Sequence, residues 1–519
     1  MALSIGAMLT SSPARPDRFN LARCCLEQNA RLRGSKVGLT VVDGAGGDTL
    51  ALTFAEVEAA VLALAGGIEG LGFPAGSRIV IRMGNEVDTI LLFFAIIAAG
   101  HVAVPTSMML TGDEARFVVA NSEAAAVVLG KEAAHERGYG EALAIGPDRL
   151  AELKRAAPLA GYADTAGEDP AYLVYTSGTT GKPKGVVHAH RVALGRRPMH
   201  SHWLDLREGD VLLHAGAFNW TYTIGVGVLD PWFCGAAATL ARDVSDPSLW
   251  AEIIRRHGVT IFAAVPGVYR QILKRGLSDD RALASLRHGV AAGEALPTPL
   301  LEEWRERTGR EIYEAFGMSE ISTFVSSCPS APARPGSPGR PQPGRRIVAL
   351  PPEGGETPVP QGGTGLLAVH RSDPGLMIGY WKRPDEEASA FRGEWFVSGD
   401  LVSFDEDGYM RHHGRDDDVM NALGYRVSPL EVEEAVAGHP SVAEVGVTEW
   451  RARADLSLIA AFVVLREGAE PDEQGIADVC AARLAAYKRP KVYHFVEKLP
   501  RSANGKLLRR RLADTVAAT

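Results

Sequence analysis

A chain of 519 residues, of which 46% are hydrophobic, can fill more than one core, so two or more domains are expected. Its net charge of −8 is modest and the signs are mixed, which argues against nucleic acid as the main partner and against a polybasic membrane anchor. The five cysteines show neither Cys-x-x-Cys pairing nor metal-ligand spacing, which favours a reducing cytoplasm.

Helical and strand patterns alternate from the N-terminus onward. Apolar spacing predicts helices over residues 53–71 and 86–99, and strands over residues 77–83 and 101–105. This alternation is typical of an α/β fold with crossovers onto a largely parallel sheet. The most apolar run falls far short of the roughly 20 residues that a bilayer requires, so we expect no transmembrane segment. No secretory signal is expected at the N-terminus, and organelle targeting stays open.

A glycine-rich loop follows a predicted buried strand at residues 171–175. Residues 175–185 read YTSGTTGKPKG and combine flexible glycines, hydroxyl donors and two lysines, which favours a phosphate cradle over an ordinary surface turn. Pro183 follows Lys182 where a Walker A loop requires Ser or Thr, so the chemistry should differ from that of P-loop ATPases. The candidate nucleotide ligands are Thr176, Ser177, Gly178, Thr179, Thr180 and Lys184.

This loop resembles the phosphate-binding signature of the adenylate-forming (ANL) superfamily of acyl-CoA synthetases, luciferases and peptide-synthetase adenylation domains. Further segments resemble the superfamily's motifs in its order: residues 313–320 (YEAFGMSE), 395–400 (WFVSGD), 414–417 (GRDD), 424–429 (GYRVSP) and 504–506 (NGK). The resemblance therefore covers most of the chain.

The resemblance implies a large N-terminal domain of α/β subdomains with a small β subdomain, followed by a small, mobile α+β C-terminal domain. We place the boundary after Gly414, which gives an adenylation domain over residues 1–414 and a C-terminal domain over residues 415–519. The Pro- and Gly-rich residues 332–344 suggest a linker, but the resemblance makes them the approach to the β subdomain instead. A strand is predicted at 362–370 and a helix at 432–439.

The chemistry implied is the joining of two anions, a carboxylate and ATP, so the site must neutralise charge and hold the carboxylate in line with the α-phosphorus. By resemblance, Lys506 stabilises the transition state and Glu320 binds magnesium, with Thr176 as a further catalytic residue. Read alone, Glu320 could be a solvated carboxylate and Lys506 one lysine of a basic tail. The Asn-Gly turn before Lys506 favours the catalytic interpretation.

The nucleotide site implied by the resemblance draws on several motifs. Asp400 would accept hydrogen bonds from the ribose hydroxyls, although a turn or cap is its alternative role, and Arg415 would help to hold ribose or phosphate. The remaining cofactor-binding candidates are Gly293, Glu294, Ala295, Tyr313, Glu314, Ala315, Phe316, Gly317 and Ser319.

The second half-reaction needs no enzyme nucleophile, because the coenzyme A thiol can attack the adenylate directly. By resemblance, the C-terminal domain swings about Asp417, and Gly424 leaves room for pantetheine in a thiol tunnel. The alternative for Asp417 is a solvated acidic run, although hinges do lie at element ends.

The acid substrate is less sharply defined. Trp220 is predicted to close the acyl pocket and Tyr222 to form one wall, although aromatic residues at this spacing are often plain core. The predicted pocket residues are Trp220, Tyr222, Pro266, Phe316 and Met318. Residues 424–429 and 293–297 resemble medium-chain acyl-CoA synthetases, some of which take benzoate-type acids. An apolar pocket separates neighbouring chain lengths by only about 1–3 kcal/mol, so the sequence leaves the acid open.

The sequence therefore predicts a cytoplasmic, magnesium-dependent acid:CoA ligase that converts a medium-chain or aromatic acid to acyl-CoA, AMP and pyrophosphate. Its cofactors would be ATP, Mg²⁺ and coenzyme A. A homodimer is compatible with this prediction, and no nucleic acid or integral membrane contact is expected. The alternatives are an adenylation enzyme that loads a carrier protein, a non-catalytic nucleotide-binding protein and an ATPase releasing ADP.

Overall fold

The structure is a computed structural model that describes residues 17–44, 49–176, 183–275, 277, 283–416, 420–422, 425–453, 456–501 and 507–517. Internal contacts divide the chain into two compact units, residues 1–346 with 370–394, and residues 347–369 with 395–519. This division leaves the boundary after Gly414 as a prediction. It does show that the Pro- and Gly-rich residues 332–344 belong to the first unit.

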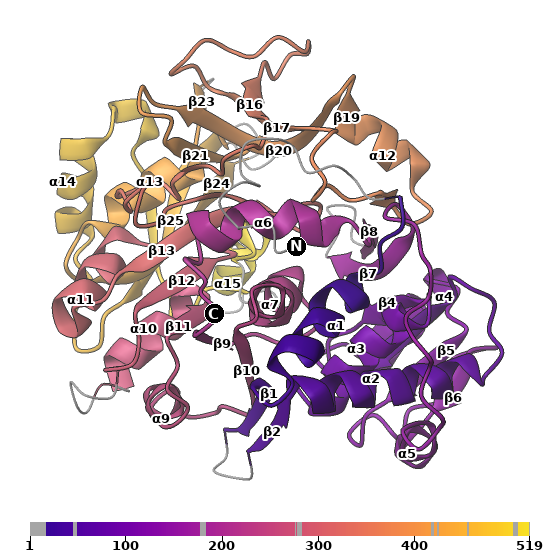
Figure 1. Cartoon of the computed structure of the whole chain (residues 1–519). Helices are drawn as coiled ribbons and strands as arrows, with labels where there is room; N and C mark the ends of the chain where they lie inside the picture. The colour runs from indigo at the N-terminus through magenta and orange to yellow at the C-terminus, as the bar shows by residue number, and fades with distance from the viewer. Residues whose placement is uncertain are drawn as a thin grey trace. The chain divides into compact units, whose positions relative to one another are not determined.

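Two sheets lie within the described residues of the first unit (Figure 1). Within the described residues, one sheet has seven strands, in the order β18 (Gly379–Tyr380), β8 (Lys184–Ala189), β7 (Pro170–Thr176), β4 (Val102–Pro105), β3 (Arg78–Arg82), β5 (Ala126–Leu129) and β6 (Leu143–Ile145). Strands β7, β4, β3, β5 and β6 run parallel, and β8 and β18 add antiparallel pairs. The parallel strands β4 and β5 are buried throughout, as expected for strands covered on both faces.

The other sheet of this unit has nine strands in the described part of the chain. Their order is β15 (Arg340–Pro341), β14 (Ser322–Ser326), β13 (Ile312–Met318), β12 (His288–Ala292), β11 (Ile261–Ala264), β9 (Val211–His214), β10 (Ala237–Arg242), β1 (Val37–Asp43) and β2 (Leu50–Thr53). The six strands from β13 to β1 are parallel, and the strands outside them are antiparallel. The prediction of a largely parallel α/β fold is confirmed.

The helices of this unit follow the sequence pattern closely. They are α1 (Leu21–Arg33), α2 (Phe54–Glu69), α3 (Val87–Ala98), α4 (Gly112–Asn121), α5 (Pro147–Leu153), α6 (Val192–His202), α7 (Thr221–Ile224), the π-helix η2 (Gly225–Leu229), α8 (Asp230–Phe233), α9 (Leu249–Arg256), α10 (Pro266–Arg275), α11 (Thr298–Thr308) and α12 (Pro384–Ala390), with a short strand β19 (Phe391–Arg392). Thr53 and Glu56 form a capping box that begins α2 where the pattern predicts a helix.

The largest core of the first unit lies around α1, α2 and α3, which contact one another (Figure 1). It combines side chains of these helices with residues of β3 and β7 from one sheet and of β1 and β10 from the other. Helix α3 is buried along almost its whole length, which explains why it is the most apolar run of the sequence. No helix among the described residues is long and apolar enough to cross a membrane.

The second unit begins with strands β16 (Ile347–Leu350), β17 (Gly365–His370), β20 (Trp395–Phe404) and β21 (Met410–Arg415), of which β16 pairs with β17 and β20 with β21 in antiparallel fashion. It continues with β22 (Met420–Ala422), β23 (Tyr425–Val427), α13 (Pro429–Ala437), β24 (Val442–Arg453), β25 (Leu456–Leu465), α14 (Glu473–Arg483), η3 (Ala486–Lys488), β26 (Val492–Phe495), η4 (Arg509–Arg511) and α15 (Asp514–Ala517). The predicted strand at 362–370 and helix at 432–439 correspond to β17 and α13.

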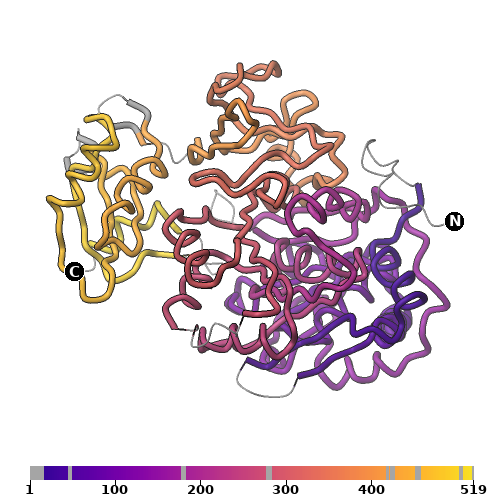
Figure 2. The backbone as a smooth tube through the Cα atoms, turned by 60° about the vertical axis from the view of Figure 1, so that its left-hand side comes forward, coloured from indigo at the N-terminus to yellow at the C-terminus, as the bar shows by residue number. Residues whose placement is uncertain are grey.

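Strands β24, β25 and β26 form a sheet near the yellow end of the chain (Figure 2). Alternate residues of β25 enter two different cores: Ile459, Ala461 and Val463 pack with α13 and α14, whereas Ala460 and Phe462 pack with Leu499 and Leu512. This period of two shows that both faces of β25 are covered. The mixed α/β fold, with a large N-terminal domain and a smaller C-terminal domain, agrees with the prediction.

Candidate active site

The predicted phosphate loop is closed by the antiparallel strands β7 and β8. Thr176 lies opposite Lys184 as the last pair of this ladder, so both side chains project from the same face of the hairpin. Both residues are half-buried. Ser177, Gly178, Thr179, Thr180 and Lys182 lie outside the described residues, and their phosphate contacts stay predictions.

Lys184 is held between a carboxylate and an aromatic ring. Its Nζ lies 2.5 Å from Oε2 of Glu386 and 5.2 Å from the centroid of the Tyr380 ring. The hydrogen bond from Lys184 holds the pKa of Glu386 below its usual range. A cation above the face of a tyrosine is stabilised by the ring quadrupole. The Lys184 ammonium group is therefore charged and paired with a carboxylate, and a phosphate oxygen could take the place of that carboxylate.

Glu320 lies in the turn between β13 and β14, at the end of the predicted motif. The Tyr380 hydroxyl donates a 2.8 Å hydrogen bond to Oε1 of Glu320, and the backbone N–H of Met377 donates a 2.7 Å bond to its carbonyl oxygen. Sequence reasoning missed Tyr380, because no local pattern links a residue in β18 to a turn 60 positions away. One tyrosine thus contacts both the lysine and the glutamate of the predicted site.

The surroundings of Glu320 fit a magnesium ion. Magnesium keeps several water ligands and usually takes one or two protein carboxylates together with phosphate oxygens. Glu320 supplies such a carboxylate, and Tyr380 fixes one of its oxygens. Among the described residues no group of three or more His, Cys, Asp or Glu side chains could hold a metal ion by itself. Glu320 is thus suited to a metal shared with ATP.

The predicted acyl-pocket residues gather at one edge of the nine-stranded sheet. Trp220 follows β9, Pro266 follows β11, and Phe316 and Met318 lie at the end of β13, while Gly293, a predicted nucleotide-binding residue, follows β12. These four strands are neighbours and run parallel, so their carboxyl ends meet at the same edge. Ligands of open α/β sheets bind at this edge. The fold therefore brings together residues that are up to about a hundred positions apart.

Trp220 lies directly against Gly293. Gly293 has a φ of +95°, and a Cβ atom there would stand 2.7 Å from Cη2 of Trp220. Only glycine accepts both this backbone conformation and this close approach without strain. The Tyr222 ring packs edge-on to Trp220 at 5.5 Å, and its hydroxyl donates to the Val290 carbonyl at 3.3 Å. Tyr222 is buried, whereas Trp220 is half-buried.

The predicted adenine strip follows β13 and the loop after β12. The backbone N–H of Leu296 donates a 3.0 Å hydrogen bond to Oε1 of Glu314, which ties this loop to β13. Burial raises the pKa of the Glu314 carboxyl to about 7. Ala315 packs in a hydrophobic core. The nucleotide roles of Glu294, Ala295, Tyr313, Glu314, Ala315, Phe316, Gly317 and Ser319 stay predictions.

A second polar cluster lies in the β20–β21 hairpin of the other unit. Nε2 of His412 is 3.0 Å from Oδ1 of the buried Asp400, and Nη1 of Arg415 is 3.9 Å from Oδ2. Burial alone would raise the pKa of Asp400, but the hydrogen bond from His412 and the charge of Arg415 hold it below its usual value. A side chain on Gly399 would overlap the guanidinium of Arg415. Asp400 is therefore an ionised acceptor at neutral pH.

His412 is a further residue that sequence reasoning missed. The rings of His412 and His413 have different partners, Asp400 and Ser403. His412 reaches Asp400 because β20 and β21 pair with Val402 opposite His412, and no local sequence pattern predicts that register. Asp417, Gly424 and Lys506 lie outside the described residues, so their hinge, tunnel and catalytic roles stay predictions.

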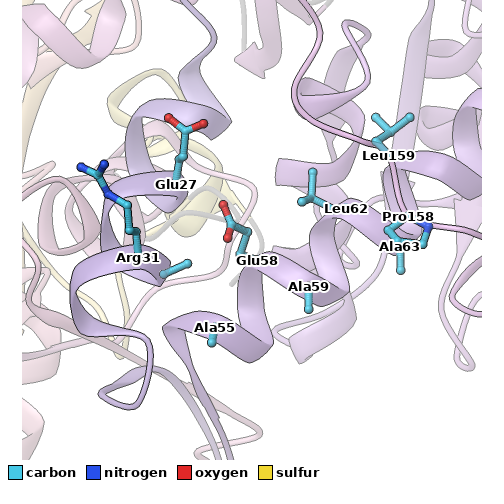
Figure 3. A pocket seen from close by; sticks show the side chains of 10 residues that line it. Glu27, Arg31, Ala55, Glu58, Ala59, Leu62, Ala63, Pro158 and Leu159 are labelled. Atoms are coloured by element: carbon cyan, nitrogen blue, oxygen red, sulfur yellow. The ribbon is translucent and has the colours of Figure 1, made fainter.

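A surface pocket of about 520 Å³ lies on α1 and α2 (Figure 3). None of its lining residues belongs to the predicted site. They are Glu27, Ala30, Arg31, Ala55, Glu58, Ala59, Leu62, Ala63, Pro158 and Leu159.

Sequence profiles of two protein families match the chain. The profile "AMP-binding enzyme" matches residues 26–381, which is more than half of the chain, and "AMP-binding enzyme C-terminal domain" matches residues 431–506. The chain belongs to the AMP-binding enzyme family. The predicted membership of the adenylate-forming superfamily is thereby confirmed.

Several relatives in this family match the chain over nearly its whole length. The 3-hydroxybenzoate–CoA ligase of Aromatoleum sp. (strain CIB) is 30% identical, with 91% of this chain and 93% of the relative covered. The benzoate–CoA ligase of Thauera aromatica is 31% identical, with 96% of each chain covered.

Solved structures of the same family agree in fold. The anthranilate CoA ligase AuaEII, solved with anthranoyl-AMP, superposes with a TM-score of 0.89 at 30% identity, covering 98% of this chain and 100% of that one. The benzoate CoA ligase of Burkholderia xenovorans LB400 superposes with a TM-score of 0.86 at 29% identity, covering 95% and 99%. The predicted enzyme class, an AMP-forming acid:CoA ligase, is confirmed. Enzymes of this class use ATP and coenzyme A.

Proposed function

We propose that the acid activated by this AMP-binding enzyme is an aromatic carboxylate of the benzoate type. Relatives named for benzoate and 3-hydroxybenzoate match nearly the whole chain, which supports an aromatic acid over a medium-chain one. The observation that carries the proposal is the contact of the Trp220 ring with Gly293 at the carboxyl edge of the sheet. It gives the predicted pocket a flat aromatic wall, against which a planar ring packs well.

The adenylation step joins a carboxylate oxygen of the acid to the α-phosphorus of ATP and expels pyrophosphate. Thr176 and Lys184, at the ends of the β7–β8 loop, would hold the phosphates, with Lys184 exchanging the Glu386 carboxylate for a phosphate oxygen. Asp400 would accept hydrogen bonds from the ribose. Lys506 would stabilise the charge that builds up on the reacting oxygens.

Glu320 would hold a magnesium ion shared with ATP. Such an ion supplies charge neutralisation for the phosphate oxygens. The contribution of the protein is to orient Glu320. The Tyr380 hydroxyl donates a hydrogen bond to the Glu320 carboxylate, and the backbone N–H of Met377 donates one to the Glu320 backbone carbonyl.

In the thioesterification step the coenzyme A sulfur attacks the acyl carbonyl, the bond to the phosphate breaks, and AMP leaves. The thiol proton must be transferred to solvent or to a group in the site. A swing of the C-terminal domain about Asp417, with Gly424 in the thiol tunnel, would separate this step from adenylation. A cytoplasmic location and a homodimer belong to the same proposal.

The test is pyrophosphate release and thioester formation with MgATP across benzoate, hydroxybenzoates, aminobenzoates, hexanoate and octanoate, with and without coenzyme A. We expect AMP as the nucleotide product and the highest kcat/KM with a benzoate-type acid. Preference for octanoate would overturn the aromatic assignment, and pyrophosphate release without thioester would point to a carrier protein. Lys506→Ala should abolish adenylation while sparing coenzyme A attack on supplied acyl-AMP.

A further inference from the structure

The buried ion pair between Arg196 of α6 and Asp230 of α8 reaches the turn that holds Glu320. Arg196 and Asp230 are 2% and 1% exposed, and they form a two-pronged pair, with Nε to Oδ1 at 2.8 Å and Nη2 to Oδ2 at 2.6 Å. Nε2 of His200 lies 3.1 Å from the same Oδ1. The remaining terminal nitrogen of Arg196, Nη1, donates to Oγ of Ser322. One guanidinium thus joins α6, α8 and β14.

The backbone of Ser322 has a strained conformation, and the hydrogen bond from Arg196 helps to hold it there. Ser322 has a φ of +69°, in the left-handed region that residues other than glycine rarely adopt. It lies two positions after Glu320 and pairs with Met318 across the turn, while Ile321 N–H donates to the Met318 carbonyl at 3.2 Å. Strained positions persist only where the surroundings over-determine them, and they gather at functional sites. The hydrogen bond from Arg196 supplies that constraint on the far side of the turn.

Space for the guanidinium is built into the neighbouring helix. A Cβ atom at Gly225, the first residue of the π-helix η2, would overlap the Nη2, Cζ and Nη1 atoms of Arg196. π-Helical turns are rare and are frequent at functional sites. A buried ion pair contributes little net stability, since the cost of removing both charges from water offsets their attraction. Stability alone therefore does not explain this arrangement.

We propose that Arg196, with Ser322 as its acceptor, is a positioning residue for the magnesium-binding turn. Three hydrogen bonds then hold this turn in place. Arg196 donates to the Ser322 hydroxyl, the Met377 N–H donates to the Glu320 carbonyl, and the Tyr380 hydroxyl donates to the Glu320 carboxylate. The inference rests on the proposed magnesium role of Glu320.

The seam between α6 and β14 provides a matched control. Along it, Arg196 meets Ser322, Met199 Sδ accepts from Thr323 Oγ1 at 3.3 Å, and the His202 carbonyl accepts from Ser326 Oγ at 2.7 Å. Ser326→Ala removes a buried serine hydroxyl from the same seam without touching the turn. Ser322→Gly removes the Oγ acceptor while accepting the left-handed backbone, so it should fold.

The experiment measures ATP binding by calorimetry, with excess Mg²⁺ and with EDTA, for the native chain, Ser322→Gly, Arg196→Lys and Ser326→Ala. Lysine keeps the positive charge beside Asp230 but lacks the fork that reaches Ser322. We expect the ratio of the two dissociation constants to shrink about tenfold or more in Ser322→Gly and Arg196→Lys, the size of one lost hydrogen bond to a charged group, and to stay native in Ser326→Ala.

The outcomes separate this inference from the proposed function. If the native protein forms acyl-CoA and binds ATP more tightly with Mg²⁺, but Ser322→Gly keeps the native ratio, then the positioning role is wrong and the ligase assignment stands. If all variants lose melting temperature alike while the ratio is unchanged, the ion pair is merely structural. If the native protein shows neither activity nor a magnesium effect, both proposals fail together.

Discussion

The Tyr380 hydroxyl donates a hydrogen bond of 2.8 Å to the Glu320 carboxylate, and the same ring lies 5.2 Å below Nζ of Lys184. Tyr380 lies in this position because β18 pairs with β8. In that pairing Tyr380 is opposite Val186, which is two residues after Lys184. The end of the phosphate loop and the proposed metal-binding turn are therefore connected through one aromatic side chain. The connection lies within the first unit.

Tyr380→Phe should lower kcat/KM for MgATP about tenfold or more, because it removes only the hydroxyl and a hydrogen bond to a charged group contributes about 1.5–3 kcal/mol. The ring below Lys184 is retained. The control is Tyr162→Phe, since the Tyr162 hydroxyl also donates to a glutamate, Glu58, at 2.7 Å in another part of the same unit. Equal loss in both variants would show that Tyr380 has no special role.

Gly293→Ala should shift the relative kcat/KM values for aromatic acids, because its Cβ would stand 2.7 Å from Trp220 and must displace that ring. It also carries the backbone cost of a left-handed residue, about 1–2 kcal/mol. Gly309→Ala isolates that cost, since Gly309 has a φ of +64° and no atom within 4 Å of an added Cβ. We expect both variants to lose thermal stability and only Gly293→Ala to change acid preference. An unchanged preference would remove Trp220 from the pocket.

Asp400→Asn should raise the KM for ATP about 10- to 100-fold, because it weakens the proposed acceptor for the ribose and leaves Arg415 without its carboxylate. The KM for the acid should change much less. Asp405→Asn is the control: Asp405 lies in the same hairpin, where its Oδ1 accepts from the Tyr409 N–H at 2.8 Å. Steady-state kinetics with ATP varied at saturating acid provides the measurement, and a native KM in Asp400→Asn would contradict the ribose role.

The local parts of this protein could be predicted from sequence, and the contacts between distant parts could not. Helices α2 and α3 were predictable because a capping box and an apolar run specify them within a few residues. The two sheets were not separated by the pattern, because buried parallel strands in both carry the same apolar signal. Two domains were foreseen from length and resemblance, but no local feature fixes where they divide.

The same distinction holds within the candidate site. Thr176, Lys184 and Glu320 lie in contiguous motifs, whereas their supporting residues come from elsewhere in the chain. Tyr380 is 60 residues from Glu320, and Arg196 is 126 residues from Ser322. Such pairs depend on which strands and helices pack side by side in the fold. A single sequence contains no pattern that predicts which distant elements become neighbours.

Glu314 should make folding stability depend on pH in a definite direction. Burial raises its carboxyl pKa from 4.5 to about 7, so between these values the folded chain binds a proton that the unfolded chain releases. Its contribution to the free energy of unfolding therefore falls as pH rises through this window, by up to about 1.4 kcal/mol per pH unit. Glu314→Gln keeps an acceptor for the Leu296 N–H and should remove this slope in urea denaturation between pH 5 and about 8. Glu311→Gln, at a partly exposed carboxylate paired with Arg305, should leave it in place. A slope that persists in Glu314→Gln would show that another group binds the proton.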